Sequence, residues 1–181
     1  MKGIVFTEFL ELVEDKFGLA VVDKIIQQSN LPSQGAYTAI GTYNFSEMLS
    51  LLNHLSEHTQ LSIDDLLLVY AEHFFSVLVT NYSGLINMYS DPIELLSSIE
   101  NHIHVEVKKI YPDAELPTFE IQEKTTSKLV MIYKSSRSMY SFGLGLMRKT
   151  FEHFDTTANI TMEKLMSDGT EVKFSIVKTN G

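Results

Sequence analysis

The stretch from His102 to Phe142 reads HIHVEVKKIYPDAELPTFEIQEKTTSKLVMIYKSSRSMYSF and contains a helix end, two strands and the start of another helix. The pair Tyr111–Pro112 predicts the helix end, because proline has no amide hydrogen to donate within a helix. Residues 129–135 alternate their side chains between two faces, which predicts a strand that pairs with residues 119–123 in an antiparallel manner.

Three polar side chains follow one another at alternate positions at the end of this strand, namely Tyr133, Ser135 and Arg137. If the backbone stays extended there, all three point to the same side. A phenol, a hydroxyl and a guanidinium that converge are suited to a planar anion such as a carboxylate. The sequence therefore predicts an anion-binding site at this point.

Two histidines, His102 and His104, lie on the helix that precedes Tyr111. Its start is marked by Asp91–Pro92, with an N-cap aspartate followed by a proline in the first turn. Both histidines have apolar neighbours at helical spacing, so helix geometry alone does not show which of them faces the interior. A single histidine on a half-apolar helix is most often a satisfied core or boundary residue.

Composition limits the protein classes that the chain can belong to. It has 181 residues, which is typical of one domain over 1–181 with a sizeable core. The net charge is −9 and basic residues do not gather, which argues against nucleic acid and anionic membranes as partners. There is no cysteine, hence no disulfide, no thiolate ligand and no covalent c-type haem. No signal peptide and no apolar run of roughly 18 residues is visible, so we expect a cytoplasmic protein.

The order of predicted elements indicates the fold class. Helices are expected over 2–17, 21–28, 45–58, 62–79 and 91–111, with a short one over 85–89 and a later one over 139–154. A hairpin over 160–166 and 170–178 turns at Asp168–Gly169. We therefore predict an α+β fold in which an N-terminal helical part is followed by a helix-packed antiparallel sheet.

A second motif competes for the function. His54-Leu-Ser-Glu57-His58 matches H-x-x-E-H, a zinc-protease signature of the inverted type. These histidines lie opposite the apolar stripe of their helix, and no clear third ligand follows in the sequence. We therefore expect them to be solvated and reject the metalloprotease interpretation.

The sequence resembles the H-NOX family (haem–nitric oxide/oxygen binding domains) over nearly its whole length. The motifs on which this resemblance rests occur in the same order as in the family. A helical histidine precedes Tyr111–Pro112, and Pro117 follows a few residues later. The motif Tyr133-x-Ser135-x-Arg137 comes next, and a helix that begins Met-Tyr-x-aromatic starts at Met139. In the family the proximal histidine lies seven residues before the tyrosine of the Tyr–Pro pair, so the resemblance implies His104 as the iron ligand.

The same resemblance implies the remaining site residues and a haem b buried between the helical part and the sheet. Tyr133, Ser135 and Arg137 would hold the haem propionates, and Pro117 would press on the macrocycle. The gas-binding side would be walled by the apolar residues Val5, Phe9, Phe142 and Leu146.

The function implied is that of a nitric oxide sensor without catalytic activity of its own, which also binds carbon monoxide. By resemblance to bacterial members, its partner would be a sensor histidine kinase or a cyclic-di-GMP enzyme. Relatives that bind oxygen carry a tyrosine where this chain has Phe142, so discrimination against oxygen is expected. The alternatives are a haem-free ligand- or partner-binding domain and a haem enzyme. The haem-enzyme alternative lacks support, because the expected wall residues Val5, Phe9, Phe142 and Leu146 offer no general acid or base.

Overall fold

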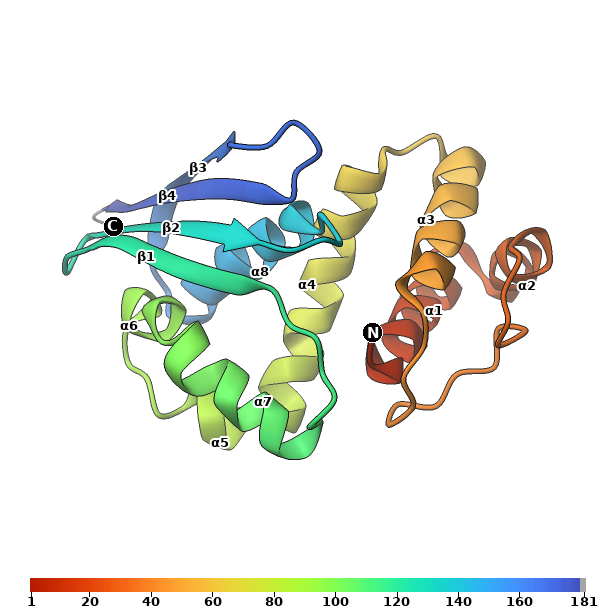
Figure 1. Ribbon diagram of the computed structural model, residues 1–181, viewed down its shortest axis with the longest axis horizontal. Coiled ribbons are helices and arrows are strands. Elements are labelled where there is room, and N and C mark those ends of the chain that lie inside the picture. The colour runs from red at the N-terminus through yellow and green to blue at the C-terminus, as the bar shows by residue number, and fades with distance from the viewer. Residues whose placement is uncertain (180–181) are drawn as a thin grey trace.

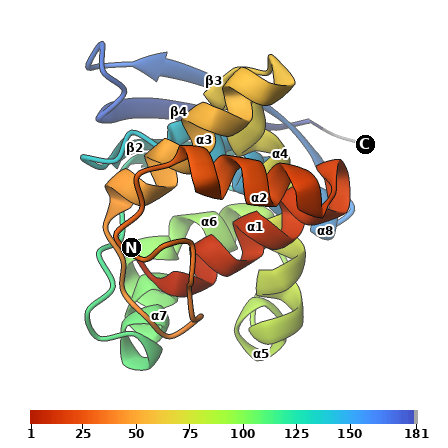
Figure 2. The same cartoon turned by 90° about the vertical axis from the view of Figure 1, so that its right-hand side faces the viewer.

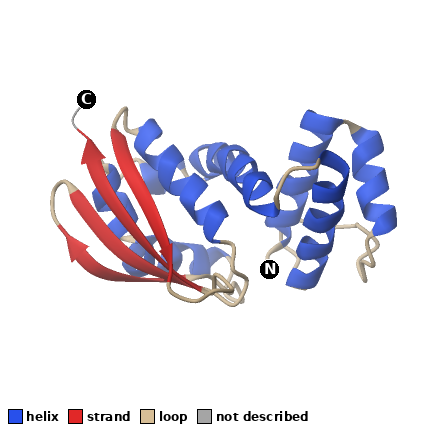
Figure 3. Ribbon diagram, turned by 90° about the horizontal axis from the view of Figure 1, so that it is seen from above, coloured by secondary structure: helices blue, strands red, loops and turns tan. Residues whose placement is uncertain are grey.

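Helices occupy the first part of the chain and antiparallel strands the last part, so the predicted α+β class is confirmed. The computed structural model describes residues 1–179. Helices α1 (Gly3–Phe17), α2 (Leu19–Gln28) and α3 (Phe45–Thr59) gather at one end, away from the sheet (Figures 1 and 3). Helix α4 (Ile63–Asn81) runs between this group and the sheet half of the molecule.

The N-terminal helices enclose their own apolar core, in which Phe6, Met48 and Leu51 are fully buried. The connection over residues 29–44 is held against α3 by a buried carboxylate, Glu47. The hydroxyls of Ser33 and Tyr37 both donate to Glu47, the latter over 3.0 Å. These bonds compensate the cost of burying the carboxylate.

In the described part of the chain, four strands form one antiparallel sheet in the order β1-β2-β4-β3. They are β1 (Thr118–Lys124), β2 (Lys128–Lys134), β3 (Thr157–Lys164) and β4 (Glu171–Thr179). The alternation expected for β2 is confirmed, since Leu129, Met131 and Tyr133 are buried on the inner face. This face packs against α8 (Tyr140–His153), which contacts α4 in turn.

The region from Asp91 to Tyr111 departs from the single helix that the sequence predicts. It consists of α6 (Pro92–Ser97), a π-helical turn (Ile99–Ile103) and α7 (His104–Ile110). Within the π-helical turn, the amide of Ile103 donates to the carbonyl of Ser98, five residues back, over 3.2 Å. A π turn inserts one residue without interrupting the helix, so apolar spacing gives no warning of it.

Two smaller features complete the path of the chain. The short helix α5 (Ser83–Ile86) begins two residues before the predicted helix over 85–89 and overlaps it at 85–86. Figure 2 shows α5 and α7 at the same end of the molecule, below α1. Across residues 1–179, none of the helices combines the length and the apolar character that crossing a membrane requires.

Candidate cofactor site

A cavity of about 330 Å³ lies between the N-terminal helices and the sheet half of the molecule. Side chains of α1, α4 and α8 line it together with the segment from α6 to β1 and the end of β2. Most of the lining is apolar, and its polar groups come chiefly from His104, from the loop over 111–117 and from the turn after β2. Its size and character are typical of sites that hold a small molecule or a cofactor.

The structure brings eight of the nine predicted site residues to the wall of this cavity, namely Val5, His104, Pro117, Tyr133, Ser135, Arg137, Phe142 and Leu146. Phe9 lies behind the wall instead. It is buried with its ring edge-to-face against Tyr70, at a centroid distance of 5.4 Å. The Tyr70 hydroxyl donates to the carbonyl of Val5 over 2.6 Å, so Phe9 supports the wall through these two residues.

His104 is anchored through one of its ring nitrogens. Its Nδ1 lies 2.8 Å from Oε1 of Glu100, and a carboxylate at this distance fixes the proton on Nδ1. Burial lowers the pKa of His104, while Glu100 opposes the shift, and the net direction favours a neutral imidazole. Nε2 therefore keeps a free lone pair, which is the condition that a metal ligand must meet.

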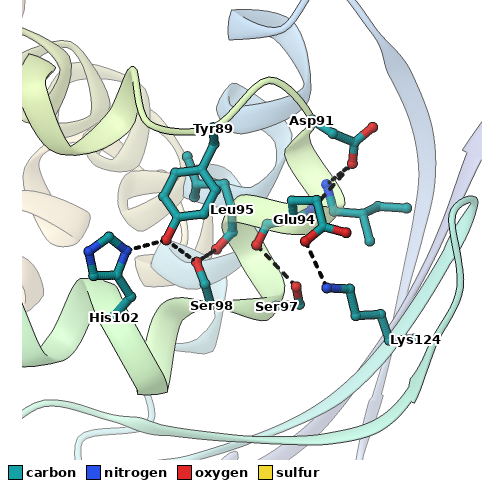
Figure 4. A network of polar contacts seen from close by, with 9 residues as sticks. Tyr89, Asp91, Glu94, Leu95, Ser97, Ser98, His102 and Lys124 are labelled. Carbon is teal, nitrogen blue, oxygen red and sulfur yellow. Dashed lines mark hydrogen bonds and ion pairs between the residues drawn. The ribbon is translucent and has the colours of Figure 1, made fainter.

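His102 is occupied elsewhere. Its Nδ1 contacts the hydroxyl of Tyr89, which also accepts a hydrogen bond of 2.6 Å from Ser98 (Figure 4). The Ser98 hydroxyl in addition lies 2.8 Å from the carbonyl of Leu95. His102 is not part of the cavity wall, so geometry separates the two histidines where helical spacing did not.

A turn at the end of β2 joins the three polar residues, of which Tyr133 is still in the strand and Ser135 and Arg137 follow it. The amide of Ser135 still bonds to the carbonyl of Thr170 over 2.9 Å. Beyond it, the Ser135 hydroxyl accepts the amide of Arg137 over 3.2 Å, and Ser138 has a positive φ of 51°. The backbone is therefore not extended as far as Arg137, so the condition under which all three side chains would point to one side is not met, because a serine hydroxyl bonds locally and closes a turn.

The guanidinium of Arg137 already holds a carboxylate. Its Nη1 donates to the carbonyl of Glu115 over 2.8 Å, and its Nη2 pairs with the carboxylate of the same residue. Tyr133 stands beside this group with its pKa raised by burial, an effect that Ser135 and the Met139 amide oppose. The donors present therefore already accommodate one carboxylate, and they fit a bound group that carries another.

The wall also contains residues that the sequence did not indicate as site residues. Phe74 and Leu78 of α4 face the cavity, and the apolar character of α4 on nearly all sides was the available signal. Tyr82 and Tyr111 contribute phenols 3.4 Å apart. Burial, and next the bond with Tyr111, raise the pKa of Tyr82 to about 12. The Tyr82 phenol therefore stays neutral at physiological pH.

The second histidine motif lies outside the cavity wall, on α3. His54 pairs with Glu57 at 3.2 Å, and the exposed His58 lies 3.2 Å from Lys24. These contacts are those of a solvated helix face, as the sequence predicts.

Comparison with known proteins identifies the class of cofactor. The family model described as haem-NO-binding matches residues 2–162. The chain belongs to the haem–NO-binding (H-NOX) family. Its cofactor is accordingly haem, and the anchored histidine, the carboxylate-holding arginine and the apolar cavity all fit that group.

Solved H-NOX structures agree with this assignment. The Fe(II) unliganded H-NOX protein from K. algicida is 69% identical, with a TM-score of 0.99 over 100% of this chain and 98% of that one. The H-NOX from Shewanella woodyi, solved with IWP-051 in the Fe(II)CO state, is 34% identical, with a TM-score of 0.84 over 99% of this chain and 95% of that one. The H-NOX from S. oneidensis in the Fe(II)NO state, 23% identical, shares the fold, with a TM-score of 0.91 over 99% of this chain and all of that one. Comparison with curated proteins gave no match.

Proposed function

We propose that this chain is a haem-based nitric oxide sensor with His104 as the proximal iron ligand. The supporting observation is the position of His104 at an apolar cavity, with Nδ1 held by Glu100 and Nε2 left free. When bound, ferrous haem supplies an iron atom that takes a diatomic gas. The solved relatives in Fe(II)NO and Fe(II)CO states make nitric oxide and carbon monoxide the gases to expect here.

Residues of the chain divide the remaining tasks among them. Arg137, Ser135 and Tyr133 bind the haem propionates, with Arg137 exchanging Glu115 for a propionate. Pro117 packs against the macrocycle. Val5, Phe142 and Leu146 wall the gas site and, with Phe9 behind them, keep hydrogen-bond donors away from it. This arrangement disfavours oxygen, which needs such a donor more than nitric oxide does.

The output passes to a separate signalling protein, a sensor histidine kinase or a cyclic-di-GMP enzyme, and the chain itself has no catalytic activity. His104 is the first residue of α7, which exposes Val105 and Ile110 on its outer side. Movement of His104 at the iron therefore moves a helix whose outer side a partner can contact. Two-state motion of this kind is what a regulatory partner reads.

The experiment that tests the proposal replaces each histidine by glycine. The reduced protein should show the absorption spectrum of five-coordinate ferrous haem. His104→Gly should lose that spectrum, and free imidazole should restore it by entering the space left by the side chain. His102→Gly is the matched control and should leave the spectrum nearly unchanged. Loss of the spectrum in His102→Gly but not in His104→Gly would assign the iron to His102 instead.

A haem-free purified protein that takes up no haem on reconstitution would favour the alternative of a haem-free binding domain. Activity of a co-purified kinase or cyclic-di-GMP enzyme, measured with and without nitric oxide, tests the signalling part of the proposal. If nitric oxide changes the activity of neither the kinase nor the cyclic-di-GMP enzyme, the signalling part of the proposal is contradicted.

A further inference from the structure

Glu100 is the side chain that directly contacts the ring of His104 through a hydrogen bond. It belongs to the π-helical turn Ile99–Ile103, and His104 is the first residue after that turn. The side chain of His104 is 15% exposed and that of Glu100 is 34% exposed. The bond of 2.8 Å between them therefore lies at the edge of the cavity, partly shielded from water.

The carboxylate of Glu100 is not shared with another group. Within residues 1–179, His104 is the one hydrogen-bond or ion-pair partner that its side chain has. Lys108, one turn further along, is the other charged residue that influences His104, and its positive charge opposes protonation of the ring. The proton on Nδ1 thus has one acceptor. This contact fixes both the tautomer of the imidazole and the orientation of its ring.

The turn that carries Glu100 is itself held in place. At its start, the carbonyl of Ser98 accepts the amides of both His102, at 2.9 Å, and Ile103, at 3.2 Å. The side chains of Ser98 and His102 both contact the hydroxyl of Tyr89, which links them (Figure 4). Glu100 consequently approaches His104 from a fixed backbone, and the pair is preorganised.

We propose that Glu100 is the positioning residue for the iron ligand and sets the strength of the iron–histidine bond. A carboxylate that accepts the Nδ1 proton pulls it toward oxygen and makes Nε2 a stronger electron donor. The stronger bond would help His104 to hold the haem and to stay attached when a gas binds. Glu100 thereby determines how much of the nitric oxide complex keeps His104 attached. The inference rests on the proposed function, because it takes His104 as the ligand.

A merely structural pair would behave differently. Glutamate and histidine at positions i and i+4 also stabilise a helix surface, and removing such a pair changes stability without altering the iron. The vibration of the iron–histidine bond separates the two roles, because it depends on the donor strength of Nε2 and not on the free energy of unfolding.

The test uses resonance Raman spectroscopy of the reduced, haem-loaded protein. Glu100→Ala should move the iron–histidine stretching band to lower frequency, and Glu100→Gln should give an intermediate position, because its neutral oxygen accepts the proton more weakly. Haem affinity in Glu100→Ala should fall by about tenfold, the lower end for loss of a group that orients a metal ligand. A larger fraction of its nitric oxide complex should be five-coordinate, measured by absorption and electron paramagnetic resonance.

Glu106→Ala is the matched control. Glu106 lies on the same helix with the same side-chain exposure of 34%, but its partner is Lys109 at 2.6 Å. It should leave the band, the haem affinity and the coordination of the nitric oxide complex unchanged. If the iron–histidine band of Glu100→Ala lies at the same frequency as that of Glu106→Ala, the inference about Glu100 is overturned, whereas the proposed function is not. A wild-type spectrum without an iron–histidine band overturns the proposed function and the inference with it. Glu100→Gln keeps the shape of the side chain, so the comparison survives if Glu100→Ala folds poorly.

Discussion

Arg137 and Glu115 are joined twice, by a hydrogen bond of 2.8 Å from Nη1 to the main-chain carbonyl and by an ion pair between Nη2 and the carboxylate. The two side chains differ in exposure, with 16% for Arg137 and 82% for Glu115. The guanidinium is therefore the fixed partner and the carboxylate the exchangeable one. A propionate that reaches Arg137 replaces a water-exposed carboxylate at little cost, since exposed ion pairs contribute little stability.

Arg137→Ala should consequently weaken haem binding much more than loss of the exposed Arg148. A hydrogen bond to a charged group contributes about 1.5–3 kcal/mol, which corresponds to roughly ten- to more than one-hundred-fold in haem affinity. The measurement is the rate of haem transfer to an excess of an apoprotein acceptor. Arg148→Ala is the control, and Glu115→Ala should retain haem at least as well as wild type. Equal transfer rates for Arg137→Ala and Arg148→Ala would contradict the role of the clamp.

Asp91 makes two stabilising contacts, and the dependence of the free energy of unfolding on pH tests both of them. It caps α6 by accepting the amide of Ile93 over 2.8 Å, and it pairs with Lys178 of β4 at 2.7 Å. Burial alone would raise the pKa of Asp91, but the Lys178 bond and the capped amides together hold it below its ordinary value. A lowered pKa means that this stabilisation is complete above about pH 4, the unfolded value, and is lost as the pH falls through the folded value.

Asp91→Ala should lower the free energy of unfolding at pH 7 by about 1 kcal/mol for the cap, plus the contribution of the Lys178 pair. Asn44→Ala is the matched control, since Asn44 caps α3 through the amide of Ser46 and has no ionic partner. Urea unfolding at pH 7 and at pH 3 should show the difference between the two variants shrinking at acid pH. A difference that is the same at both pH values would exclude an ionic contribution from Asp91.

Two glycines of α8 provide opposite tests of packing. A Cβ added to Gly145 would lie 2.5 Å from the Cβ of Ala71 on α4, whereas a Cβ added to Gly143 meets nothing within 4 Å because it faces the cavity. Gly145→Ala should destabilise the fold by about 1–3 kcal/mol through overpacking. Gly143→Ala should stabilise the haem-free chain by up to about 1 kcal/mol through helix propensity, yet slow haem uptake. Thermal unfolding and haem titration of both variants measure these effects.

The parts of the fold that the sequence predicted are those with strong periodicity. The alternation of β2 placed Leu129, Met131 and Tyr133 correctly on the inner face, because a strand with one buried face tolerates no shift of register. The π-helical turn before His104 was not predicted, since its extra residue leaves the apolar pattern of a helix almost intact. The turn at Ser135 was missed for a similar reason, because a local hydroxyl–amide bond overrides the alternation of a strand.

The site shows the same division. His104 and Arg137 were named as site residues from the sequence and both line the cavity, but the choice of His104 over His102 came from the family resemblance and not from helical spacing. Phe9 was expected at the wall but lies behind it, since one apolar side chain at helical spacing resembles another. Glu100 was overlooked although its i, i+4 spacing to His104 was visible, because most such pairs only stabilise a helix surface.

The gas selectivity can be tested at Phe142. Its ring lies 5.1 Å from that of Tyr70 and 5.6 Å from that of Phe74, so the surroundings are aromatic. The nearby hydroxyls are already used: Tyr70 donates to the carbonyl of Val5 at 2.6 Å and Thr150 to that of Leu146 at 2.8 Å. Oxygen on ferrous iron acquires negative charge and is stabilised by a donor, while nitric oxide gains little from one. A hydrogen bond to a charged partner is worth about 1.5–3 kcal/mol. Oxygen should therefore bind here more weakly than in a pocket that offers such a donor, by a factor of roughly ten to more than one hundred.

We therefore expect the reduced protein to form no stable oxygen complex in air, while nitric oxide and carbon monoxide bind. Phe142→Tyr should place a phenol in the cavity and slow the dissociation of oxygen, while nitric oxide binding stays nearly unchanged. Stopped-flow absorption measures the dissociation rate. Phe154→Tyr adds a phenol just after the same helix but outside the cavity wall, and should have no effect on oxygen dissociation. The explanation would fail if the unmodified protein kept an oxygen complex for long in air. In that case a donor other than residue 142 would have to reach the bound gas, from Thr150 or Tyr70 after loss of its carbonyl partner or from the wall phenols of Tyr82 and Tyr111.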